Sequence, residues 1–277
     1  MDSNSSTVDP SNPDREDGEA VSIGRPADPC GRGLRLLTFV SCFIAGVVAW
    51  GVGETSLVRV EAKLVPLVTM GNKHEGTTAA TERAALIATA SRNSAVLGAA
   101  LGLAMAAAGG LIRRKPAGAL RAALTGAALG GVAGGLAALG SVTLYLKASP
   151  SFENDLIPSL IMHGAISIAL GVVAAFAFGL GIGTDKTWGR RVQLLAGGGG
   201  GALLGAVAFQ VVGGLLLPID GTAEPISTTS QARFLSSVLV SSFTAIGAAA
   251  GFLNSKQPII RTVADGRPIQ SPQSLHR

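Results

Sequence analysis

Six long apolar runs, separated by polar connections, dominate the pattern of the chain. They cover residues 34–52, 94–112, 122–146, 159–183, 192–217 and 234–253. A helix rises 1.5 Å per residue, so about 20 residues cross the roughly 30 Å hydrocarbon layer of a bilayer. Backbone groups in lipid must be satisfied within their own segment, which favours helices. The pattern predicts an all-α polytopic membrane protein, a six-helix bundle built from two-helix hairpins.

Both ends of the chain are polar. Residues 1–33 are rich in Ser, Asp, Asn, Pro and Gly, and residues 254–277 carry prolines and scattered charges without periodicity. Segments of this composition cannot bury enough apolar surface to offset the entropy lost on folding. We therefore expect a single membrane domain over 34–253 with a disordered tail on each side.

The connection over residues 53–93 is much longer than the others. Its segment 58–64 alternates apolar and polar residues like an edge strand until Pro66 interrupts it, and it could equally lie flat at the membrane interface. The residues after Thr78 are good helix formers. They predict that the second helix begins near Thr78 and extends several turns beyond the bilayer.

Composition agrees with a protein that is surrounded mostly by lipid. Apolar residues make up 48% of the chain and charged residues 14%, and the mean hydropathy is +0.46. Soluble domains usually carry about 25% charged residues, because water must wet their surface. An ordinary water-soluble enzyme is therefore excluded.

The positive charges predict an orientation. The second and fourth connections contain seven basic residues: Arg113, Arg114, Lys115, Arg121, Lys186, Arg190 and Arg191. The third and fifth contain only Lys147 and Arg233. Because Lys and Arg stay on the cytoplasmic side, both termini are expected to be cytoplasmic, in the plasma (inner) membrane. Bases confined to such short turns indicate topology and not nucleic-acid binding.

Small residues recur every fourth position in five of the runs. The helix-packing glycines predicted in this way are Gly98, Gly102, Gly126, Gly130, Gly134, Gly171, Gly179, Gly197, Gly201 and Gly205. Positions i and i+4 share one helical face, and in lipid such faces let backbones approach closely. The pattern predicts glycine-zipper packing inside one chain, and packing between copies in a homo-oligomer is the alternative.

Shifting the chain on itself by about 71 residues suggests an internal repeat. The second and third runs then align without a gap on the fourth and fifth, with 12 identities over the 58 positions from residues 92–149. This would be a parallel repeat of hairpins, as transporters can contain. The alternative is that glycine-rich hairpins resemble one another because small residues pack alike.

A few polar residues are candidates for a site. Arg92, His163 and Arg233 begin the second, fourth and sixth runs and could form a polar ring at the outer mouth, suited to an anion or a lipid phosphate. Alternatively, each extends separately to the lipid headgroups. Gln210 lies deep within a run, where its amide is expected to hydrogen-bond a neighbouring helix.

Motifs for catalysis are not found. No charged residue lies deep in any run, and no spacing of nucleophiles or of Cys and His fits a known site. We expect no catalytic residue, metal or cofactor; an enzyme would need Glu61, His74, Glu75 and Glu82 to converge. The sequence favours a non-enzymatic structural or assembly component with membrane lipid as its partner. A small-solute permease or channel made of hairpin repeats is the alternative.

Overall fold

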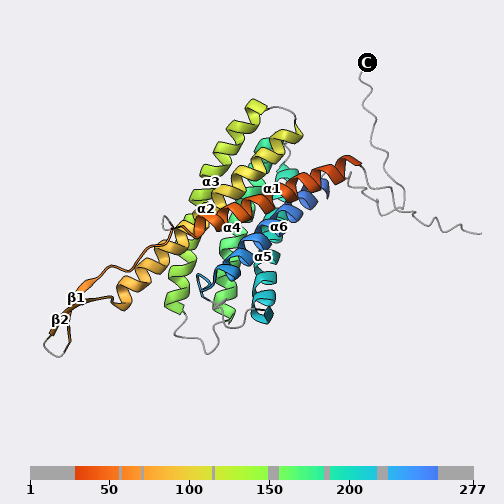
Figure 1. Cartoon of the computed structure of the whole chain (residues 1–277). Helices are drawn as coiled ribbons and strands as arrows, with labels where there is room; N and C mark the ends of the chain where they lie inside the picture. The colour runs from red at the N-terminus through yellow and green to blue at the C-terminus, as the bar shows by residue number, and fades with distance from the viewer. Residues whose placement is uncertain are drawn as a thin grey trace, which may run out of the picture.

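The computed structural model describes seven stretches of the chain (Figure 1). They are residues 29–55, 58–69, 72–113, 116–148, 156–183, 188–216 and 224–254. The two tails predicted to be disordered lie almost entirely outside the described residues.

Six long helices account for nearly all of the described chain. They are α1 (Pro29–Gly53), α2 (Ala79–Ile112), α3 (Pro116–Ala148), α4 (Leu156–Ile182), α5 (Trp188–Leu216) and α6 (Ser230–Asn254). Each covers one predicted run to within one residue and extends beyond it at one or both ends. All six are long and apolar enough to cross a membrane. The predicted polytopic helical bundle is thereby confirmed.

A small β-hairpin lies in the long first connection. Strands β1 (Val65–Thr69) and β2 (Asn72–Gly76) pair antiparallel, with Leu67 opposite His74. In Figure 1 the hairpin projects beyond the helices, beside the start of α2. Residues 58–64 form no strand, so the edge strand considered there is wrong; the strand begins at Val65 and includes Pro66.

Helix α2 begins where the sequence predicts. The Thr78 hydroxyl accepts the Thr81 N–H at 3.3 Å, and the Thr78 N–H donates to the Thr81 hydroxyl at 2.9 Å. This reciprocal cap satisfies donors that the first turn leaves free. Over its 34 residues α2 is about 51 Å long, far more than the roughly 30 Å hydrocarbon layer. Its first turns therefore extend outside the membrane.

The helices form a ring around an apolar interior. α1 packs on α2 and α6, α4 packs on α2 and α5, and α5 packs on α6, while α3 lies outside this ring against α2 and α4. Leu101, Met105 and Phe178 are fully buried in the interior. On the outside, Leu136 and Leu144 are 61% and 67% exposed. Water would penalise such a surface and lipid does not, so the chain is an integral, multi-pass membrane protein.

The two ends of the bundle differ in charge. At one end of the bundle α1 finishes and α2, α4 and α6 begin; we call this the hairpin end. We call the opposite end the basic end. All the described carboxylates, on residues Glu54, Glu61, Glu75, Glu82 and Glu224, belong to segments at the hairpin end. The described part of the basic end carries arginines and no carboxylate.

Glycines bring α2 and α3 into backbone contact. A Cβ added to Gly98 would collide with the Gly130 carbonyl, and one added to Gly130 would collide with the Gly98 carbonyl. Gly102 and Gly126 form an equivalent pair one turn further along. Gly134 completes the seam against the Ser94 carbonyl.

Helix α5 uses its glycines on two sides. Gly198 meets Gly171 on α4, whereas Gly197 and Gly201 meet the backbone of α6 at Gly247 and Phe243. A Cβ on the next predicted residue, Gly205, would lie 2.8 Å from the Val240 Cα, also on α6. Gly179 is buried near the end of α4.

Candidate functional site

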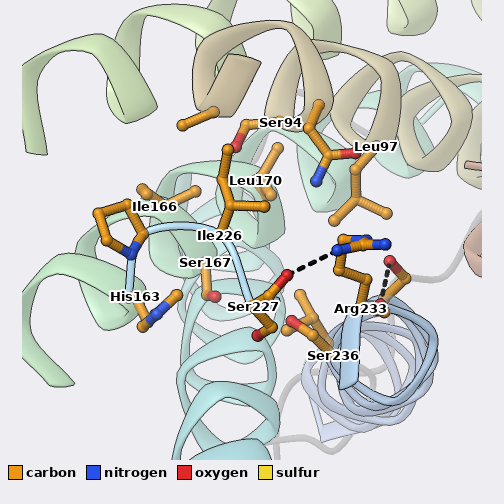
Figure 2. Close-up of a pocket in the computed structure, with 15 residues that line it drawn as sticks. Ser94, Leu97, His163, Ile166, Ser167, Leu170, Ile226, Ser227, Arg233 and Ser236 are labelled. Atoms are coloured by element: carbon orange, nitrogen blue, oxygen red, sulfur yellow. Dashed lines mark hydrogen bonds between the residues drawn. The ribbon is translucent and has the colours of Figure 1, made fainter. Parts of the chain in front are cut away.

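A polar cavity opens among α2, α4 and α6 at the hairpin end (Figure 2). Its volume is about 80 Å³, and residues 225–227, which precede α6, form part of its wall. Helix α6 begins here because the Thr229 hydroxyl accepts the Ala232 N–H at 3.3 Å, a typical N-cap. The cap fixes where the first residues of α6 face the cavity.

Arg233 is held by a carboxylate and by two carbonyl groups. Its Nε donates to Glu54 Oε1 at 2.7 Å, and a terminal nitrogen donates to Oε2 at 3.0 Å. The other terminal nitrogen donates to the carbonyls of Ser227 at 2.7 Å, dashed in Figure 2, and of Thr228 at 3.0 Å. Pairing of this kind offsets the cost of burying a charge. The cavity wall therefore presents no uncompensated cation at Arg233.

Glu54 is the carboxylate of this cluster and directly follows α1. Besides Arg233 it contacts Arg59, whose terminal nitrogen lies 3.0 Å from Oε2. The hydrogen bond from Arg233 is the main reason why the pKa of Glu54 lies below its ordinary value, and the charges of both arginines act in the same direction. The carboxylate thus remains ionised and links α1 to α6.

His163 lies on the opposite wall of the cavity. Its Nε2 is 3.2 Å from the Glu224 carbonyl oxygen, and its ring meets Phe209 edge-to-face at 6.1 Å. A carbonyl oxygen only accepts, so Nε2 carries the hydrogen and Nδ1 is the acceptor of the neutral ring. This hydrogen bond ties the residue before Pro225 to α4.

Only two residues of the predicted polar ring line the cavity. His163 and Arg233 face it, but Arg92 is exposed on α2, and its neighbour Asn93 takes the place expected for it. Successive residues of a helix point about 100° apart, so one position decides which side chain faces inward. A cationic ring suited to an anion is therefore not formed.

Hydroxyl groups supply polar surface where the spacing of small residues predicts only packing. Ser94 and Ser167 belong to the small-residue faces of α2 and α4, yet both line the cavity, as does Ser236. Ser167 is only 5% exposed, and within the described part of the chain these three hydroxyls have no hydrogen-bond partner. A cavity of this size and polarity can hold several waters or one small uncharged molecule that donates and accepts hydrogen bonds.

The cavity ends within the bundle. Leu97, Leu170 and Val240 are its deepest lining residues. One turn further, Leu101 and Thr244 are fully buried. Below them the apolar core continues toward the basic end. Toward the basic end the cavity is therefore followed by buried side chains of the bundle interior.

The other predicted polar residues lie apart from this cavity. The amide nitrogen of Gln210 on α5 donates to the Ser159 hydroxyl on α4 at 3.2 Å, a bond between neighbouring helices. All four groups that an enzyme would need are exposed, at residues Glu61, His74, Glu75 and Glu82. Among the residues the structure describes, no group of three His, Cys, Asp or Glu side chains could hold a metal ion.

The chain was compared with known proteins at the level of family, sequence and structure. It matches no family model, no curated protein and no solved structure. Its activity must therefore be inferred from its own geometry.

Proposed function

We propose that the chain is a non-enzymatic structural or assembly component of a membrane, packed through close helix contacts at glycines. The apolar interior supports this proposal best: Leu101, Met105 and Phe178 are fully buried between the cavity and the basic end. Charge asymmetry in the connections favours the plasma (inner) membrane with both termini in the cytoplasm.

A small-solute permease is the second candidate, and the cavity is the observation that favours it. Its lining of Ser94, Ser167 and His163 suits an uncharged solute better than an ion, because Arg233 is already neutralised by Glu54. Transport would require the helices to separate around Leu97, Leu170 and Val240. The structural role requires no such motion.

Osmotic measurements on proteoliposomes separate the two candidates. Vesicles containing only this chain should take up urea and glycerol no faster than protein-free vesicles, because the apolar core blocks the route. Faster entry that Ser167→Leu abolishes, and that Thr125→Leu on the exposed side of α3 leaves unchanged, would establish the permease instead.

The assembly role has its own test. Extracted from native membranes in a mild detergent, the chain should migrate in a complex of defined size larger than one 27.7 kDa copy. Recovery as a single copy under conditions that preserve other membrane complexes would contradict the assembly role. The same measurement decides whether the partner is a second copy, since a homo-oligomer contains this chain alone.

A further inference from the structure

A long apolar groove runs along the outer side of the α4–α5 seam, from the basic end to the middle of the bundle. Two adjoining hollows of about 250 and 350 Å³ form it, and both are lined by Trp188 and Leu195. Its far end lies at Ile168 and Leu203. From Trp188 to Leu203, α5 rises about 22 Å, which is more than half of the roughly 30 Å hydrocarbon layer.

Gly200 opens this groove and has no role in helix packing. A Cβ added there would meet nothing within 4 Å, in contrast to Gly198 and Gly201, whose added Cβ atoms would collide with α4 and α6. Glycine within a helix is less favourable than alanine by about 1 kcal/mol. Gly200 lines the groove together with Gly199, and contacts with other helices of this chain do not account for it.

Two guanidinium groups flank the groove where it reaches the basic end. Arg191 lines it there, beside the 73% exposed Trp188. Gly183 also lines it and adopts a positive φ of 67°, and the Arg113 guanidinium packs against this glycine. Within the described part of the chain, neither arginine has an ion pair, and no described carboxylate lies at this end.

We propose that this groove binds one anionic phospholipid. The phosphate lies between Arg113 and Arg191, the Trp188 indole lies at the level of the headgroup, and one acyl chain follows the groove past Gly200. Basic sites between membrane helices attract anionic headgroups, and the apolar hollow continuing from the arginines fits an acyl chain and not a free anion. The inference does not depend on whether any solute crosses the bilayer.

The headgroup part is tested with the delipidated full-length chain in a neutral detergent. Native mass spectrometry should show phosphatidylglycerol binding at least about tenfold tighter than phosphatidylcholine with the same acyl chains. Arg113→Gln combined with Arg191→Gln should remove this preference, and Arg121→Gln, at an exposed position of the same end, should preserve it. Equal binding of the two lipids, or an equal loss in the Arg121→Gln variant, would overturn the proposal.

The acyl-chain part is tested with a matched pair of glycines on α5. Gly200→Leu should fill the groove and weaken phosphatidylglycerol binding several-fold. Gly214→Leu should bind as the unmodified chain does, because an added Cβ there also meets nothing within 4 Å but Gly214 does not line the groove. Unchanged binding in the Gly200→Leu variant, or full competition by inorganic phosphate, would show that the groove contributes nothing and would overturn the proposal.

Discussion

A single missing Cβ decides how closely two helices approach in this protein. Gly98 and Gly130 each face the carbonyl group of the other, so neither position accepts a larger residue without moving a helix. Gly140, on the same helix as Gly130, has no neighbour within 4 Å of its missing Cβ. Spacing by four therefore identifies helix faces, while the structure identifies which glycines are in contact.

Gly130→Val should destabilise the bundle and Gly140→Val should not. The valine at 130 would push α3 away from α2, and overpacking of this kind costs about 1–3 kcal/mol of unfolding free energy. Thermal or denaturant unfolding in detergent measures both variants against the unmodified chain. Equal stability of the two variants would show that the α2–α3 seam does not depend on close backbone approach.

Glycine spacing predicts helix faces but not the helices that they meet. Gly126 and Gly134 on α3 face α2, the preceding helix. Gly197 and Gly205, which align with them under the 71-residue shift, face α6, the following helix. Matched glycines thus make different contacts, and the internal repeat stays a prediction. Which helix a glycine face meets depends on the packing of all six helices. The sequence of a single run does not encode that packing.

At the scale of whole elements, α1 is fastened to α6 at the hairpin end. The Trp50 indole N–H lies 3.1 Å from the Ser230 carbonyl oxygen and its ring meets Phe234 edge-to-face at 5.2 Å. The Glu54–Arg233 pair lies close by in the chain and connects the end of α1 to the first turn of α6. Together these contacts hold α1 across one side of the ring.

The Glu54–Arg233 pair predicts a pH dependence of stability. The pKa of Glu54 in the folded chain lies below its ordinary value of 4.5, so its stabilising effect is complete above that value and is lost as the pH falls through the lowered folded pKa. Glu54→Gln should therefore lower the thermal midpoint at pH 7, and the difference from the unmodified chain should shrink toward pH 3.

The control for this prediction is Glu61→Gln, which removes an exposed carboxylate from the same connection. It should leave the thermal midpoint at pH 7 unchanged. A difference between Glu54→Gln and the unmodified chain that persists undiminished at pH 3 would show that the ionised pair is not its origin.

The hairpin shows where hydrophobic periodicity gives no signal. β2 reads Asn72-Lys73-His74-Glu75-Gly76 and has no apolar alternation, because neither of its faces is buried in a core. The pairing of β2 with β1 depends on both segments, so the periodicity of β2 alone does not reveal it. Long apolar helices could be predicted because lipid imposes a length and a composition on each of them separately.

The cavity was only partly predictable for a similar reason. His163 and Arg233 stood out as polar residues at helix ends, but small size alone could not distinguish a packing serine from a lining one. Ser241, which does not line the cavity, donates to the carbonyl of Ser237 on its own helix at 2.5 Å, whereas the lining Ser167 makes no such bond. That difference depends on where α2, α4 and α6 diverge, and it is visible only in three dimensions.

Across the whole molecule, the charged groups lie at the two ends and the apolar surface lies between them. The described carboxylates lie at the hairpin end, the described part of the basic end carries arginines such as Arg191 and no carboxylate, and a broad apolar surface separates them. Among the described residues, an even number of spans brings the start of α1 and the end of α6 to one side and the hairpin to the other. The positive-inside rule then predicts that the tails are cytoplasmic.

The most direct test of a lipid-embedded six-span bundle is to determine which side of the membrane each end faces. In a chain whose Cys30 and Cys42 are replaced by alanine, Lys73→Cys marks the hairpin and Arg121→Cys marks the basic end; both positions are exposed. A membrane-impermeant maleimide should label Lys73→Cys in intact cells and Arg121→Cys only after permeabilisation. Labelling of both positions from the same side would contradict the six-span arrangement.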